Sequence, residues 1–283
     1  MEISKKLTWW KTILYCLVFL TIFLGAAIIS DLATRWISNL SLRFIIRELA
    51  LRLPLSLFLM HLFARKVVKL DNSVFYINAV HKRLLKWLFT GIIWSSILLA
   101  LILVLNPASY LYKGGQIESK WIVYYVISTV AMAINGGLIE EILFRGYIMG
   151  LLKEKWNLKI AVLIPSVLFG IMHLTMLETF QFVDFLLLLV GGTLVGVMFS
   201  LIVIKTKNVF AAALFHIVWN LFYAGRFLKI STLPLEEIKS IYAIQLNSDN
   251  ILLTGGSYGI EVSGIAIAIY AMVSLTLFRK IKW

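Results

Sequence analysis

The chain has 283 residues, of which 61% are apolar and 14% are charged. Soluble domains have about 45–50% apolar and about 25% charged residues, so this composition excludes a soluble globular enzyme, a disordered chain and a nucleic-acid-binding domain. The net charge of +13 is typical of basic cytoplasmic loops in a polytopic membrane protein. The single cysteine, Cys16, excludes an intramolecular disulfide and a multi-cysteine metal site.

Eight apolar segments follow one another along the chain, and a spanning helix needs about 20 mainly apolar residues. They predict an all-α polytopic membrane protein with about eight transmembrane helices around a polar intramembrane cavity. The segments are 13–29, 44–63, 88–105, 121–143, 160–173, 182–204, 209–223 and 262–278. The chain divides into N-terminal spans (1–120), a core (121–225), and a non-cytoplasmic loop with the last span (226–283). We expect an irregular lid or interfacial piece at 225–260.

The distribution of basic residues predicts the orientation in the membrane. If the N-terminus is cytoplasmic and all eight segments cross, the cytoplasmic side carries 17 Lys and Arg residues and the opposite side carries seven. This asymmetry follows the positive-inside rule and predicts cytoplasmic termini in the cell membrane. It favours a retained first span over a cleaved signal peptide. It also favours the second segment as a span, although Arg47, Glu48 and Arg52 interrupt it. Glu48 and Arg52 have the spacing of an ion pair on one helix face.

The fourth apolar segment contains two adjacent glutamates, Glu140 and Glu141, followed by Arg145. Arg145 lies about 40° around a helix from Glu141 and about 140° from Glu140. It can therefore neutralise Glu141, which we assign a supporting role, while Glu140 remains a reactive carboxylate. Ionisable residues inside a membrane are functional candidates because their burial is costly. The alternative for this group is a purely structural ion-pair cluster.

Three further polar residues lie in later apolar segments: His173, His216 and Asn220. Asn220 lies one turn after His216, on the same helix face. Measured along the helices from the nearest cytoplasmic lysine, Glu140, His173 and His216 lie about 20, 21 and 14 Å deep. Helix tilt can absorb the difference, so all of them can line one cavity. A histidine that only forms hydrogen bonds between helices is the alternative for each.

Two chemistries fit these residues. A glutamate can take a proton from water beside a neutral histidine, and His216 with Asn220 can donate hydrogen bonds to a developing oxyanion. Alternatively, Glu140, His173 and His216 form a two-histidine, one-glutamate set for Zn²⁺, which consumes the glutamate as a ligand. The chain has no H-E-x-x-H sequence, which excludes a zincin-type helix.

The chain resembles the CAAX protease and bacteriocin-processing family of intramembrane proteases, also called the Abi domain. The family motifs are E-E-x-x-x-R, F-x-x-x-H and H-x-x-x-N/D. They correspond here to Glu140–Arg145, Phe169–His173 and His216–Asn220, in the expected order. Each motif alone is weak, but the ordered set within apolar helices is specific. The resemblance covers about residues 121–225, the CAAX protease/Abi core.

The resemblance implies hydrolysis of a peptide bond in a membrane-associated or lipidated substrate. One branch, the Ras-converting CAAX endopeptidases, cleaves after a prenylated cysteine, and bacterial relatives are linked to bacteriocin maturation, self-immunity or peptide signalling. In the family, the residues matching Glu140 and His173 activate water, and those matching His216 and Asn220 stabilise the oxyanion. The family is commonly labelled a metalloprotease, which implies Zn²⁺ or another divalent metal. The expected partners are a peptide or protein substrate and the lipid bilayer, with no nucleic acid.

Two other classes remain open. The first is a non-proteolytic bacteriocin-immunity or scaffold protein, which would keep its protective effect in a Glu140→Gln variant. The second is a proton-coupled transporter, since buried Glu and His residues can relay protons. The sequence lacks the paired broken helices and internal symmetry that transporters often have. Proton-dependent flux in liposomes would support that class.

Overall fold

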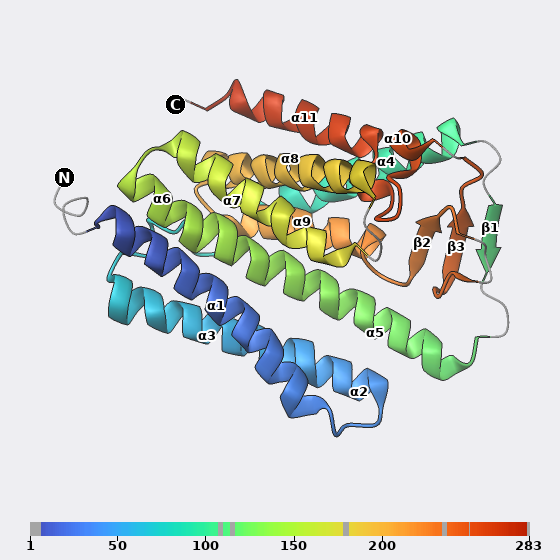
Figure 1. Ribbon diagram of the computed structural model, residues 1–283, viewed down its shortest axis with the longest axis horizontal. Coiled ribbons are helices and arrows are strands. Elements are labelled where there is room, and N and C mark those ends of the chain that lie inside the picture. Colours follow the sequence, from blue (N-terminus) through green and yellow to red (C-terminus); the bar gives the residue numbers. More distant parts are fainter. Residues whose placement is uncertain are drawn as a thin grey trace.

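A computed structural model describes residues 7–106, 110–113, 117–177, 181–233, 237–248 and 250–281. Most of these residues form helices, and the long ones lie side by side (Figure 1). The α-helices are α1 (Trp9–Thr34), α2 (Leu40–Ile45), α3 (Leu53–Phe63), α4 (Leu85–Leu105), α5 (Ser119–Asn135), α6 (Met149–Lys155), α7 (Leu158–His173), α8 (Phe182–Thr206), α9 (Val209–Tyr223), α10 (Ile251–Thr254) and α11 (Gly264–Phe278).

Within the described residues, five helical stretches are long and apolar enough to cross a membrane. They are Trp9–Thr34, Lys82–Leu105, Ser119–Lys155, Leu158–Met176 and Phe182–Thr206. Helices α9 and α11 are apolar but shorter, with 15 residues each. The fold class, an all-α polytopic membrane protein, is confirmed, and the total of about eight crossings stays a prediction. The second predicted span lies within α2, α3 and the helical turns between them, and crossing by this segment stays a prediction.

Four helical turns have π-helical hydrogen bonding: Ile46–Arg52, Ala64–Val68, Gly136–Glu140 and Ile142–Ile148. Such turns are rare and occur mostly at functional sites. The helix that begins at Ser119 continues through two of them to Lys155. The depth estimate for Glu140 requires this continuity, since it measures along one helix from lysines that are expected on the cytoplasmic side.

A small sheet lies at one end of the helices, in the right-hand part of Figure 1. Its strands are β1 (Tyr110–Lys113), β2 (Leu228–Ser231) and β3 (Tyr242–Gln245), in the order β1-β3-β2. Strand β3 pairs antiparallel with β1 and parallel with β2. The loop expected to be irregular therefore contains two strands and α10. The sequence did not predict the strands. Each has only four residues, and the β1–β3 pairing joins segments more than a hundred residues apart.

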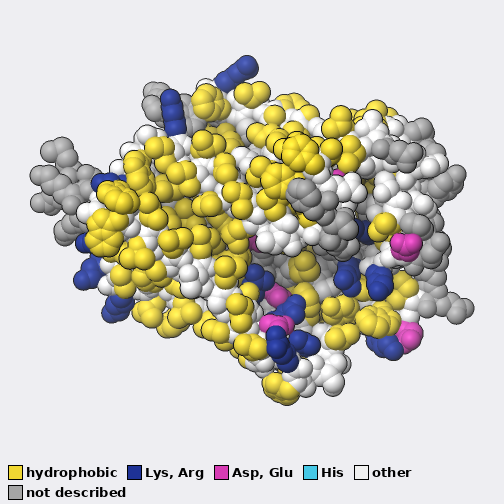
Figure 2. Space-filling view, in the orientation of Figure 1, with side chains coloured by type: hydrophobic (Ala, Val, Ile, Leu, Met, Phe, Trp, Pro, Cys, Tyr) yellow, Lys and Arg dark blue, Asp and Glu magenta, His cyan; other side chains and the backbone are white. Residues whose placement is uncertain are grey.

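Hydrophobic side chains cover much of the outer surface, while charged side chains gather around a recess on the right-hand part of the face (Figure 2). Helix α1 illustrates the outer surface: Leu17, Leu24 and Ile28 are exposed, whereas Phe19 and Phe23 are buried. A soluble protein rarely exposes apolar surface of this extent, and lipid would cover it here. Some of the charged side chains, among them Arg47, Arg52 and Lys229, line a cavity between the helices.

Candidate active site

A cavity of about 540 Å³ lies among the helices, and all four predicted catalytic residues line it. Glu140 comes from the end of a π-helical turn, His173 from the last turn of α7, and His216 and Asn220 from α9. The structure thus brings together the residues that the depth argument placed in one layer. Their catalytic roles stay predictions.

Glu141 does not face the cavity but forms the centre of a buried ionic cluster. Its Oε1 atom lies 2.9 Å from Nη1 of Arg145 and 3.0 Å from Nδ1 of His216. The Glu141 and Arg145 side chains are fully buried. The pair with Arg145 is the one that the i, i+4 spacing predicts. The bond to His216 joins residues 75 positions apart and could not be predicted from spacing.

Aromatic rings hold Arg145 in place together with the carboxylate of Glu141. Its guanidinium carbon lies 4.4 Å from the ring centre of Phe169 and 5.5 Å from that of Phe199. Within the described residues, its Nε and Nη2 atoms have no hydrogen-bond partner, so the ring faces supply part of the compensation for lost hydration. Gly196 of α8 leaves the required space, since a Cβ there would lie 3.1 Å from Nη2.

The tautomer of His173 follows from its hydrogen bond. Nδ1 lies 2.8 Å from the carbonyl oxygen of Phe169, and a carbonyl can only accept. Nδ1 therefore carries a proton, and in the neutral ring Nε2 keeps its lone pair. In this state Nε2 can accept a proton from a water molecule or a hydrogen bond from it. The ring also packs on Phe169, with centroids 4.3 Å apart, which fixes its orientation in the cavity.

The same argument applied to His216 restricts its role. Because its Nδ1 donates to the Glu141 carboxylate, the neutral ring has no proton on Nε2. Nε2 can therefore donate to an oxyanion only when the ring carries both protons. Stacking against Phe199, with centroids 4.9 Å apart and planes 23° apart, holds the ring in place.

Glu140 and Asn220 approach each other beside Gly136. A Cβ at Gly136 would lie 3.0 Å from Nδ2 of Asn220 and 3.5 Å from Oε1 of Glu140. The missing side chain leaves room for both polar groups to reach the cavity. Glu140 has no ion pair within the described residues, unlike its neighbour Glu141, and this matches the division of roles predicted from helix geometry.

The ligand types for a metal are present in the cavity, and metal binding stays a prediction. Glu140, His173 and His216 supply one carboxylate and two imidazoles, which suit Zn²⁺. Nevertheless, the part of the chain that the structure describes contains no group of three His, Cys, Asp or Glu side chains placed to hold one ion.

Several cavity residues lie outside the predicted set. Arg47, Glu48 and Arg52 line one side, and Lys229 and Glu261 line another. Burial raises the pKa of the Glu261 carboxyl above its usual value, and the charges of Lys229 and His216 oppose this shift. The interruption of the second apolar segment was the available signal for the first three. No pattern marked the other two: Lys229 lies in strand β2, and Glu261 lies in a short helical turn just before α11.

The fold and the cavity define a polytopic membrane protein with an acid–histidine site among its helices. Residues 120–222 match the family model described as "Type II CAAX prenyl endopeptidase Rce1-like". The chain is also similar to the "Putative membrane peptidase YdiL" of Bacillus subtilis, with 30% identity over 150 residues. That match spans about half of each protein, 51% of this chain and 54% of the relative. No solved structure matches. Both matches are similarities to membrane peptidases over part of the chain.

Proposed function

We propose that this protein is an intramembrane endopeptidase that hydrolyses a peptide bond in a membrane-associated or lipidated peptide or protein. The observation that supports it best is the shared cavity of Glu140, His173, His216 and Asn220, within the segment that matches the peptidase family model. Apolar and aromatic side chains make up much of the remaining wall, including Phe44, Met132, Leu188 and Val262, which suits an apolar peptide.

The proposed reaction begins with a water molecule between Glu140 and His173. Glu140 takes one proton from the water, and the lone pair on Nε2 of His173 orients it. The resulting hydroxide attacks the peptide carbonyl carbon, and the electron pair of the carbonyl moves onto its oxygen. The electron pair on the oxygen then re-forms the C=O double bond, and the C–N bond breaks as the leaving nitrogen takes the proton from Glu140. The products are a carboxylic acid, which releases its proton to solvent, and an amine.

Asn220 and His216 lie where they can stabilise the charge that develops on the carbonyl oxygen. The side-chain amide of Asn220 donates directly from α9. His216 donates from Nε2 in its doubly protonated form, with the Glu141 carboxylate holding Nδ1. Removing one donor of this kind costs about 10²–10³ in rate in other hydrolases. Arg145 fixes Glu141 and so positions His216 indirectly.

The test is comparative membrane peptidomics of cells that express wild-type protein, Glu140→Ala or His173→Ala. The wild type is expected to generate peptide products that both variants lack. Glu154→Ala is the matched control, because Glu154 lies on the same continuous helix but outside the cavity. Products that persist unchanged in either active-site variant would contradict the proposal. The identity of the products would also decide among bacteriocin maturation, self-immunity and peptide signalling as the physiological role.

A further inference from the structure

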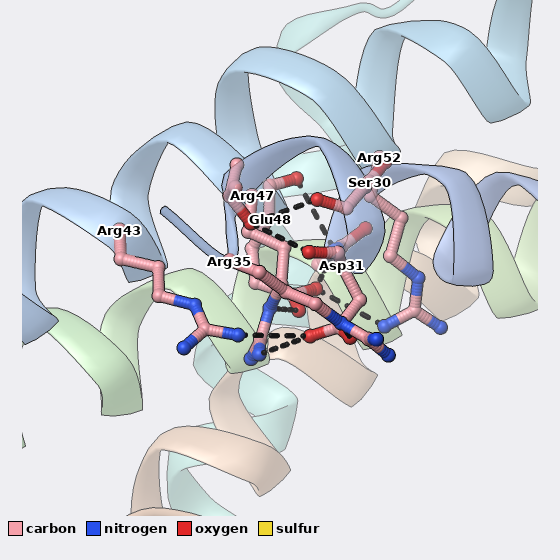
Figure 3. Close-up of polar contacts among 9 residues, drawn as sticks. Ser30, Asp31, Arg35, Arg43, Arg47, Glu48 and Arg52 are labelled. Carbon is pink, nitrogen blue, oxygen red and sulfur yellow. Dashed lines mark hydrogen bonds and ion pairs between the residues drawn. The ribbon is translucent and has the colours of Figure 1, made fainter. Parts of the chain in front are cut away.

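Six charged residues near the cavity form a group that we call the arginine cluster. Its members are Asp31, Arg35, Arg43, Arg47, Glu48 and Arg52. In Figure 3, three of the arginines converge on the carboxylate of Asp31. The N–O distances there are 3.0 Å for Arg35, 3.3 Å for Arg43 and 3.5 Å for Arg47.

Glu48 is the second carboxylate of the cluster, and its bonding capacity is used within the protein. It pairs with Arg47 at 2.9 Å and with Arg52 at 3.0 Å, and it accepts a hydrogen bond from Asn135. Its side chain is only 8% exposed. Four guanidinium groups are therefore balanced by two carboxylates, and the cluster carries an excess of positive charge. An excess of positive charge on partly exposed side chains beside a cavity favours an anionic ligand there.

The arginine cluster reaches the proposed active site through two of its members. Arg47 and Arg52 line the same cavity as Glu140 and His173. Their side chains are 26% and 25% exposed, so both can contact a ligand in the cavity. The Nε atom of Arg52 has no hydrogen-bond partner within the described residues. A buried N–H donor without a partner destabilises the protein, and a hydrogen bond to a ligand oxygen would offset that cost.

The chemistry of these groups selects the ligand. A guanidinium has five N–H donors in a planar fork that matches a carboxylate, and charge-assisted bonds of this kind are the strong ones. Apolar residues, among them Phe44 and Phe169, line the cavity that Arg52 shares with Glu140. A ligand with an apolar body and one carboxylate complements this arrangement.

We propose that Arg47 and Arg52 bind a carboxylate of the peptide substrate and so determine which bond lies beside Glu140. This rests on the proposed function. The carboxylate can come from the C-terminus of the substrate or from an acidic side chain, and both present the same oxygen pair. Arg47 and Arg52 act as specificity-determining residues, while Glu48 and Asp31 hold them in place.

The test measures peptide binding to Glu140→Gln protein in phosphatidylcholine nanodiscs, so that hydrolysis does not interfere. The probes are three N-acetylated hexapeptides of alanine and leucine: a C-terminal acid, its neutral amide, and the amide with one central glutamate. Binding is followed by tryptophan fluorescence, since Trp219 lines the cavity. We expect at least one carboxylate probe to bind about tenfold more tightly than the neutral amide, in line with a hydrogen bond to a charged group. Which of the two does so identifies the source.

Variants assign the effect to particular arginines. Arg52→Gln and Arg47→Gln should each remove most of the carboxylate preference, and using both guards against one variant that fails to fold. Arg35→Gln is the control, because Arg35 belongs to the cluster but does not line the cavity and is 63% exposed. It should keep the full preference.

Equal affinity for all three peptides would overturn the proposal, and so would a carboxylate preference that survives in both variants. A third contrary result is the absence of any preference among the peptides, together with a preference for phosphatidylglycerol nanodiscs that depends on Arg47 and Arg52. The last result would assign the cluster to a lipid phosphate instead. Loss of peptidomic products in Glu140→Ala tests hydrolysis separately, so a failure of binding specificity and a failure of the proposed function give different patterns.

Discussion

Two glutamate–arginine pairs with the same i, i+4 spacing occupy very different surroundings. Glu141 and Arg145 lie 2.9 Å apart with both side chains fully buried. Glu48 and Arg52 lie 3.0 Å apart, but Arg52 is 25% exposed and lines the cavity. Local spacing accounts for both pairs equally well. Because it is buried, the first pair can only hold His216 in place. Because Arg52 is partly exposed, the second pair presents positive charge to the cavity.

The largest expected effect separates the two pairs by stability. Arg145→Met leaves the Glu141 carboxylate buried beside His216 without its main partner. Breaking a buried ion pair in this way typically costs about 3–5 kcal/mol. Arg52→Met should cost about 1 kcal/mol or less, because Glu48 keeps Arg47 and both arginines contact the open cavity. Thermal unfolding of both variants in one detergent measures the difference, and equal midpoints would show that burial does not distinguish the pairs.

The aromatic neighbours of the two clusters should also differ. The Arg145 guanidinium lies 4.4 Å from the Phe169 ring centre, and that of Arg47 lies 4.7 Å from the Phe44 ring centre. A desolvated cation–π contact contributes about 2 kcal/mol, against about 0.5–1 kcal/mol at an exposed site. Phe169→Leu should therefore lower the unfolding temperature more than Phe44→Leu. The opposite order would contradict the role assigned to the rings around Arg145.

A smaller effect concerns activity more than stability. Gly136→Ala places a methyl group 3.0 Å from Nδ2 of Asn220 and 3.5 Å from Oε1 of Glu140. We expect cleavage to slow about tenfold, equivalent to about 1.4 kcal/mol, since misplacing catalytic groups is costly. Gly25→Ala is the control, because a Cβ there meets nothing within 4 Å. A wild-type cleavage rate in Gly136→Ala would show that cleavage does not require Asn220 and Glu140 to lie close together beside Gly136.

The smallest effect is expected at the exposed edge of the arginine cluster. The Arg35–Asp31 pair has side chains that are 63% and 34% exposed, and water and salt screen such a pair. Arg35→Gln should leave the free energy of unfolding close to the wild-type value, because Asp31 keeps two other arginines. Chemical denaturation of wild type and variant checks this. A large loss would mean that the cluster folds as one cooperative unit.

The sequence predicted those features that depend on one helix. Apolar length located most of the spans, and spacing alone identified the Glu141–Arg145 pair and separated Glu140 from it. The depth of each polar residue was accessible because a helix rises by a fixed amount per residue. Similar depth made a shared cavity possible, but the packing of the helices decides that these residues line one cavity.

Features that depend on the rotation of one helix against another were not predictable. The bond from His216 to Glu141 and the place of Arg47 and Arg52 on the cavity wall both depend on packing between distant segments. Packing also decides which histidine nitrogen keeps its lone pair, a point that changes the role His216 can take. The small sheet was missed because its strands are short and β1 pairs with a strand more than a hundred residues away.

The central claim is that Glu140, and not its neighbour, takes the proton from water. The most direct measurement is the single-turnover rate at which reconstituted wild type and Glu140→Gln cleave a peptide identified by the peptidomic comparison. Unfolding midpoints confirm that both are folded. General-base catalysis contributes about 10²–10⁴-fold, so the account predicts a loss of at least about 100-fold in Glu140→Gln. A rate within about threefold of wild type would contradict it.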